Sequence, residues 1–219
     1  MFYGALLSWS FSPGQMGREQ GGEVTPEVGL WNGARSDGTV AHGAIPGYRV
    51  NDVEAVAVRV RSAGGATKEP QERPYGLESD CVDNQGVSFY LHQLLDTPTD
   101  DDGDLANGRQ HGDVGYMSLG VPELALAEEF YGEVLGWTIT PGSHAQSRQI
   151  GGVTPMSGLW QTDAPGVVLA YRVDDIQPAV AQVGTLGGTA SSVEERPYGL
   201  AADNCVDDRG TIFHLLQLR

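Results

Sequence analysis

The chain carries one series of short motifs twice, in the same order along the sequence. So many matches in one order show an internal duplication, which predicts two similar structural units. The matched segments are Phe2-Tyr3-Gly4 and Phe130-Tyr131-Gly132, Gly29-Leu30-Trp31 and Gly158-Leu159-Trp160, Tyr48-Arg49-Val50 and Tyr171-Arg172-Val173, Arg73-Pro74-Tyr75-Gly76 and Arg196-Pro197-Tyr198-Gly199, and Cys81-Val82-Asp83 and Cys205-Val206-Asp207.

A segment of different composition separates the two copies. Residues 96–112 are rich in aspartate and contain hardly any apolar side chains. Such a stretch cannot bury enough surface to order itself. We therefore expect one domain at 1–95, an acidic flexible linker at 96–112 and a second domain at 113–219.

Within each copy, the spacing of apolar residues changes between the strand period and the helix period. In the second copy, Tyr116–Val121 alternates like a strand, and apolar residues from Pro122 to Leu135 follow a helical spacing. Continued along the copy, the pattern gives β-α-β-β-β twice over, which predicts an α+β fold. In the first copy Met1 stands directly before Phe2, so the opening strand and half of the helix of that domain are missing. We expect the true start to lie upstream of Met1, and the alternative is that the linker or a second molecule fills the gap.

Composition limits the partners of the chain. With 29 acidic and 13 basic residues, the formal net charge is −16, which repels nucleic acid and anionic membranes. No apolar run is long enough to span a membrane, and the N-terminus does not read as a signal peptide. Cys81 and Cys205 occupy equivalent places in the two copies, which favours buried packing positions in a reduced, cytoplasmic protein.

The order of these motifs resembles the glyoxalase, bleomycin-resistance and extradiol-dioxygenase proteins, which form the vicinal oxygen chelate superfamily. The residues that carry the resemblance are Phe-Tyr-x-x-x-Leu-x-Trp after the first strand, Val-Asp-Asp-Ile at the second helix and Val-Asp-x-x-Gly before the last strand. The resemblance implies tandem glyoxalase-like domains built from βαβββ modules, with a cleft on the concave face of an open sheet. It also implies buried module interfaces, either in a homodimer or in a pseudo-dimer within one chain.

In the superfamily members that use a metal, His and Glu side chains from three strand positions hold a divalent ion. The corresponding residues are Tyr116, Val168 and His214 in the second copy. In the first copy, the position on the first strand is missing. The other two positions are occupied by Ile45 and Tyr90. His214 alone is a competent ligand, and one imidazole does not make a site. The sequence therefore predicts no metal site and no cofactor, and it disfavours a divalent metal.

Without a metal, a cleft works through shape, aromatic rings and hydrogen bonds. His214 and Tyr116 are the candidate acid/base pair, because histidine titrates near neutral pH. For Trp31 and Trp160, ordinary packing is the favoured alternative to ligand binding. Arg73 and Arg196 are expected to pair with nearby acids. The candidate ligand-binding residues are Trp31, Trp160, Tyr90, Tyr75, Tyr198 and His92.

Three functions follow from the resemblance. The first is a metal-independent protein that binds a small aromatic or cationic molecule, of the antibiotic-resistance or sequestration type. The second is a lyase, isomerase or dioxygenase that acts through His214 or through a metal site placed elsewhere. The third is a scaffold that has lost catalysis. The fold alone does not decide among them.

Overall fold

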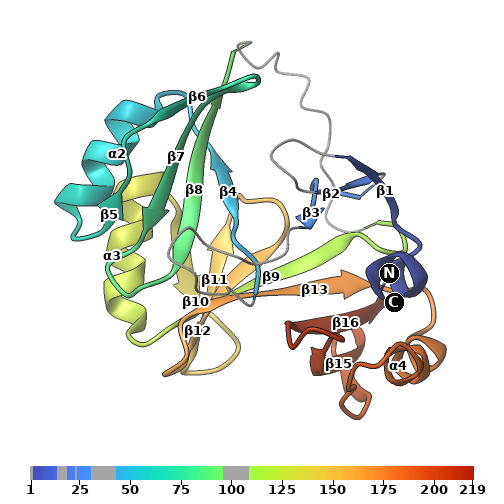
Figure 1. Ribbon diagram of the computed structural model, residues 1–219. Coiled ribbons are helices and arrows are strands. Elements are labelled where there is room, and N and C mark those ends of the chain that lie inside the picture. Colours follow the sequence, from blue (N-terminus) through green and yellow to red (C-terminus); the bar gives the residue numbers. More distant parts are fainter. Residues whose placement is uncertain (1, 14–18, 23, 31–42, 96–108) are drawn as a thin grey trace. The chain divides into compact units, whose positions relative to one another are not determined.

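The computed structural model describes residues 2–13, 19–22, 24–30, 43–95 and 109–219 (Figure 1). Trp31 and most of the predicted linker lie outside these ranges. The chain is an α+β protein in which short helices alternate with many strands, as the sequence predicted. None of the described helices is long and apolar enough to cross a membrane.

Contacts divide the chain into two compact units, and each unit combines half of one repeat with half of the other. Unit 1 comprises Met1–Gly43, Leu105–Met117 and Val168–Arg219, and unit 2 comprises Ala44–Asp104 and Ser118–Val167. The boundaries predicted at 1–95 and 113–219 follow the sequence repeat. The compact units, in contrast, cut each repeat near its middle.

In unit 1 the strands run in the order β9-β13-β16-β15-β14 and, separately, β1-β2-β3. β13 and β16 are parallel, and β15 is antiparallel to both β16 and β14. The elements are α1 (Phe2–Leu7), β1 (Ser10–Pro13), β2 (Glu19–Gly22), β3 (Gly29–Leu30), the first half of β9 (Val114–Val121), most of β13 (Gly166–Arg172), α4 (Ile176–Thr185), β14 (Glu194–Arg196), β15 (Gly199–Val206) and β16 (Ile212–Leu218).

In unit 2 the strand orders are β4-β8-β7-β5, with β6 also paired to β7, and β10-β11-β12-β9. β4 and β8 are parallel, like their equivalents β13 and β16. The elements are β4 (Gly47–Arg49), α2 (Val53–Ser62), β5 (Ala66–Thr67), β6 (Gln71–Arg73), β7 (Gly76–Val82), β8 (Ser88–Leu94), the second half of β9, α3 (Leu124–Leu135), β10 (Thr138–Pro141), β11 (Ser147–Gly151) and β12 (Ser157–Gln161).

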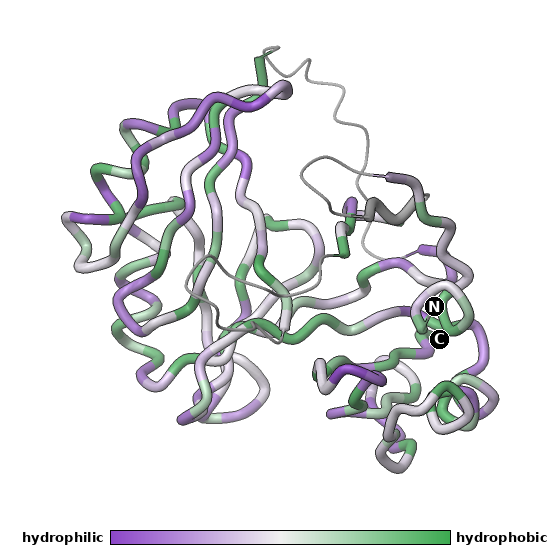
Figure 2. The backbone as a smooth tube through the Cα atoms, in the orientation of Figure 1, coloured by the Kyte–Doolittle hydropathy of each residue, from purple (hydrophilic) through white to green (hydrophobic). Residues whose placement is uncertain are grey.

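The last strand of each repeat directs one face into the main core of its unit. On β8, Phe89 and Leu91 are buried, and on β16 their equivalents Phe213 and Leu215 are buried. Figure 2 shows hydrophobic and hydrophilic residues interspersed along the strands. Because successive side chains of a strand point to opposite faces, the residues between these positions lie on the other face, away from the helices.

A buried tyrosine–aspartate hydrogen bond joins the two repeats in unit 2. Oη of Tyr131, on α3, donates to Oδ2 of Asp83 at 2.9 Å. Oδ1 of Asp83 accepts the backbone N–H groups of Gln85 and Val87, both at 2.8 Å. Both carboxylate oxygens are thus hydrogen-bonded, which a buried charge requires.

Unit 1 contains the same arrangement with the repeats exchanged. Oη of Tyr3, on α1, donates to Oδ2 of Asp207 at 2.9 Å. Oδ1 of Asp207 accepts the N–H groups of Arg209 and Thr211, both at 2.8 Å. The Phe-Tyr motif of each repeat therefore bonds the Val-Asp-x-x-Gly turn of the other.

Aromatic rings surround both hydrogen bonds. Tyr131 stacks on Trp137 with centroids 4.9 Å apart, and Tyr3 stacks on Trp9 at 5.4 Å. The tyrosine of each Tyr-Arg-Val motif packs edge-on against the tryptophan. The Phe-Tyr-Gly, Tyr-Arg-Val and Cys-Val-Asp motifs thus contribute to the core of each unit.

The two cysteines are packing residues, as the sequence predicted. Cys81 and Cys205 are both buried and free. Burial raises the pKa of the Cys81 thiol to about 11. Both thiols are therefore protonated and unreactive near neutral pH.

We predict that Tyr131→Phe lowers the free energy of unfolding by about 1.5–3 kcal/mol, because Asp83 loses a hydrogen bond to its buried carboxylate. Urea denaturation of the whole chain measures the effect. Tyr48→Phe in the same unit is the control, because Oη of Tyr48 is buried and has no hydrogen-bond partner among the described residues. Equal losses in the two variants would contradict the role of the Tyr131 hydroxyl.

Candidate functional site

The predicted site residues fall into two groups, one in each unit. Tyr116, Tyr198 and His214 lie in unit 1, on β9, beside β15 and on β16. The group in unit 2 consists of Tyr75, Tyr90, His92 and Trp160. Trp31 lies outside the described residues.

The unit 1 group lies on a small apolar floor. Ala170, Ala201 and Leu216 form a buried cluster that is separate from the main core, and Tyr116 and Leu218 pack against it. Ala170 is the register partner of His214 across β13 and β16, so His214 lies on the same face. We call the face formed by these six residues the second-repeat face.

His214 is held at the edge of this floor by a hydrogen bond to the backbone of β15. The N–H of Asn204 donates to Nδ1 of His214 at 2.8 Å. Burial lowers the pKa of the imidazole, and the charge of Asp203 opposes that shift only in part. His214 is therefore neutral near neutral pH, as a general base must be.

Polar groups border the second-repeat face. Arg196 donates to Oδ2 of Asp203 at 2.9 Å, as expected for an arginine that stabilises the Arg-Pro-Tyr-Gly turn. Tyr198 is 48% exposed. Burial raises the pKa of both Tyr116 and Tyr198, so both hydroxyls are protonated. Among the described residues, no hydrogen bond joins Tyr116 to His214, so the predicted acid/base pair is not preformed.

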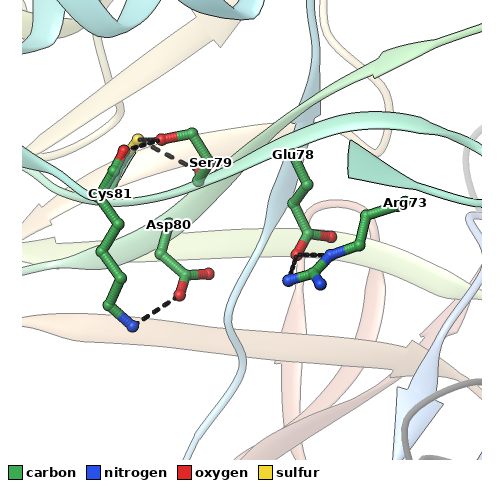
Figure 3. Close-up of polar contacts among 6 residues, drawn as sticks. Arg73, Glu78, Ser79, Asp80 and Cys81 are labelled. Carbon is green, nitrogen blue, oxygen red and sulfur yellow. Dashed lines mark hydrogen bonds and ion pairs between the residues drawn. The ribbon is translucent and has the colours of Figure 1, made fainter. Parts of the chain in front are cut away.

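The equivalent positions in unit 2 form a polar face instead. Glu78 is 4% exposed, and its carboxylate accepts hydrogen bonds from Arg73 and from the hydroxyl of Tyr75. Figure 3 shows the Arg73 guanidinium against this carboxylate. Burial and the bond to Glu78 raise the pKa of Tyr75 to about 12. Sequence reasoning placed Arg73 correctly as the partner of an acid, but it did not single out Glu78.

Tyr90 and His92 continue the polar face along β8. A Cβ atom added at Gly47 on β4 would lie 2.2 Å from Cζ of Tyr90, so the tyrosine ring needs glycine beneath it. The rings of Tyr90 and His92 have centroids 5.8 Å apart. Burial and the charge of Arg49 lower the pKa of His92. We call Gly47, Glu78, Tyr90 and His92 the first-repeat face.

Trp160 lies on β12 and is 42% exposed, so it is not a core residue. Its ring meets His144 edge-on, with centroids 6.4 Å apart. An exposed indole remains available to a ligand. Trp160 belongs to unit 2, whereas the second-repeat face belongs to unit 1.

The two repeats differ mainly on these faces. The core-facing residues of the last strand, Phe89 and Leu91, are repeated as Phe213 and Leu215. On the opposite side the residue types change, with the first repeat named first in each pair: Gly47 and Ala170, Glu78 and Ala201, Tyr90 and His214, His92 and Leu216. The duplication thus kept one core and diverged into two chemically different faces.

The residues at the metal positions do not fit a divalent ion. Tyr116 supplies a phenol, Val168 an alkyl group and His214 an imidazole. Ile45 and Tyr90 add no strong metal donor. Across the part of the chain that the structure describes, no three His, Cys, Asp or Glu side chains are grouped so that they could hold a metal. Asn204 and Asp203, which contact or approach His214, were missed. The available signal was that the second repeat has one more residue than the first before its cysteine.

No family model matches the chain, and no curated protein matches it. Several solved structures share its fold. A 2,2',3-trihydroxybiphenyl 1,2-dioxygenase from Sphingomonas wittichii is 17% identical with a TM-score of 0.66, and the match covers 99% of this chain and 83% of that one. The 2,3-dioxygenase LapB from Pseudomonas sp. KL28 is 14% identical with a TM-score of 0.63, over 99% and 85% of the two chains.

A Mn(II)-bound glyoxalase from Novosphingobium aromaticivorans is similar to the same extent. It is 14% identical with a TM-score of 0.65, and the match covers 99% of this chain and 76% of the glyoxalase. Dioxygenases and a glyoxalase thus share one architecture with this protein. The chain has the fold of the vicinal oxygen chelate superfamily, which the order of its motifs predicted.

Proposed function

We propose that the protein binds a small aromatic molecule on the second-repeat face, without a metal ion. The observation that carries this proposal is the apolar floor of Ala170, Ala201 and Leu216, with the ring of Tyr116 against it and His214 on the same face. A flat apolar surface with a few polar groups at its border suits a planar ligand.

The comparisons with solved structures support an aromatic ligand. One similar structure is a dioxygenase of 2,2',3-trihydroxybiphenyl. The same fold in that protein accommodates a substrate built of aromatic rings. A positive charge on the ligand of the present protein is favoured by the net charge of −16.

Metal independence is supported by the residues at the metal positions. A divalent ion in a protein site takes about three protein ligands. Tyr116, Val168 and His214 include one strong donor among them. Binding would therefore rest on ring packing and hydrogen bonds.

Catalysis through His214 is the second candidate function. The imidazole is neutral near neutral pH because burial lowers its pKa, and it lies on the same face as the proposed ligand. A neutral imidazole beside a bound ring can take or deliver a proton. Turnover of a bound compound that is lost in His214→Ala, with binding retained, would favour a lyase, isomerase or dioxygenase of this kind. If the second-repeat face binds no ligand, the third function, a scaffold that has lost catalysis, is favoured.

We predict that exchanging two residues of the floor for those of the first repeat weakens aromatic binding. The variant Ala201→Glu/Leu216→His places a carboxylate and an imidazole where the probe would lie, so its Kd should rise at least about tenfold. Isothermal titration with 2-naphthol and with N-methylquinolinium as probes measures the change. The variant is expected to fold, because Arg196 and Tyr198 occupy the positions of the groups that hold Glu78 in the first repeat.

The reciprocal variant Glu78→Ala/His92→Leu is the control, because it changes the other face and should retain binding. Unchanged binding in the first variant, or loss of binding in the control alone, would contradict a binding site on the second-repeat face. Absence of binding by the wild-type protein across neutral and cationic aromatic probes would contradict the proposal.

We also predict that divalent metals leave the melting temperature unchanged. Ni²⁺, Zn²⁺, Mn²⁺ and Fe²⁺ are compared with chelator on untagged protein, and elemental analysis gives the metal content. A ligand that binds only the folded state raises the melting temperature. About one tightly held ion per chain, with a clear rise in melting temperature, would overturn the metal-independent proposal.

A further inference from the structure

Between the Arg-Pro-Tyr-Gly motif and the cysteine, the second repeat has one residue more than the first. The structure places that additional residue opposite His214. In the first repeat β7 and β8 pair without interruption, so that Asp80 alone faces Tyr90. In the second repeat the pairing of β15 with β16 shifts register between Ala202 and Cys205. Asp203 and Asn204 therefore both lie opposite His214, which is a β-bulge.

The bulge turns a backbone donor toward the imidazole. Asn204 has a φ of 59°, in the left-handed region that asparagine tolerates better than most residues. This conformation directs its N–H to Nδ1 of His214 at 2.8 Å. In the first repeat, Asp80 pairs with Tyr90 in regular register.

This hydrogen bond fixes the position of the imidazole proton. A backbone N–H is only a donor, so Nδ1 must be the unprotonated, accepting nitrogen, and the proton of neutral His214 lies on Nε2. Asp203 does not reverse the assignment, because its Oδ1 is 3.7 Å from Nδ1, too far for a hydrogen bond. Asp203 is instead bound to Arg196 through Oδ2.

Nε2 is the ring nitrogen that is left for a ligand. The side chain of His214 is 17% exposed, and its hydrogen bond within the described residues is made through Nδ1. A histidine that ligates a metal through one nitrogen commonly donates a hydrogen bond from the other. In His214, by contrast, the nitrogen bonded to the protein, Nδ1, accepts a hydrogen bond, and the other nitrogen, Nε2, carries the proton.

We propose that Asn204 is a positioning residue that holds His214 with its proton on Nε2, so that His214 donates a hydrogen bond to an acceptor oxygen, a carbonyl or phenolate, of the aromatic ligand. The identity of the ligand rests on the proposed function. The position of the proton does not, because the bulge sets it without any ligand.

Nitrogen-15 NMR of the imidazole rings tests the positioning role, with the His214 signals assigned by their loss in His214→Asn. The wild-type protein should show an unprotonated Nδ1 and a protonated Nε2. Asn204→Gly keeps both the N–H and the positive φ, so it should keep this pattern. Deletion of Asn204 gives the second hairpin the length of the first, and the exclusive Nε2-protonated pattern should then be lost.

A protonated Nδ1 in the wild-type protein, or the same pattern after the deletion, would overturn the positioning role. Circular dichroism and urea denaturation of the deletion variant establish that it folds, and the uninterrupted first-repeat hairpin is the precedent. If the deletion variant does not fold, loss of the pattern in Asn204→Gly would overturn the proposal in the same way.

Two probes of similar shape test whether the ligand accepts a hydrogen bond from His214. The Kd of 2-acetylnaphthalene should be at least about tenfold lower than that of 2-isopropylnaphthalene, and His214→Leu should reduce this ratio to near one. Equal affinities in the wild-type protein would refute the ligand part of the proposal. Failure of both probes to bind would refute the proposed function, while the NMR result would still decide the role of Asn204.

Discussion

The hydrogen bonds from Tyr131 to Asp83 and from Tyr3 to Asp207 organise the molecule. Each aspartate shapes its own turn through two backbone N–H groups and uses its remaining oxygen for a tyrosine of the other repeat. The turn leads directly into the last strand, β8 or β16. That strand has the core on one face and the candidate site residues on the other. The position of His214 therefore depends on a contact made between the two repeats.

The sequence predicted much of the fold because its repeated residues are those that build the core. Phe130, Tyr131 and Phe89 are large buried rings, and the spacing of such residues indicates strands and helices directly. His214 and Tyr116 lie on one face, as expected from their strand positions. Their role as an acid/base pair stays a prediction. The expectation that no divalent metal binds rests on residue types alone, which do not depend on packing, and it stays a prediction.

Three features could not be predicted, each for a physical reason. Asp83 and Asp207 sit in the same motif, so each is complementary to Tyr3 and to Tyr131, and the motif does not say which tyrosine it meets. Buried Glu78 breaks the rule that carboxylates are exposed, and hydrogen bonds from the neighbouring Arg73 and Tyr75 make its burial tolerable. The bulge at Asn204 depends on backbone register, which side-chain periodicity does not report beyond a difference in length.

The exchange of partners between repeats has a consequence for a chain with one repeat. Such a chain would carry a tyrosine and an aspartate that do not bond each other, and both would be left without partners unless a second copy supplied them. Its folding would then depend on protein concentration. Joining two copies in one polypeptide replaces that encounter with an intramolecular one, whose effective concentration is set by the connecting segment. Dilution no longer separates the halves. Each half is then free to change its outward face, since the other always completes its core.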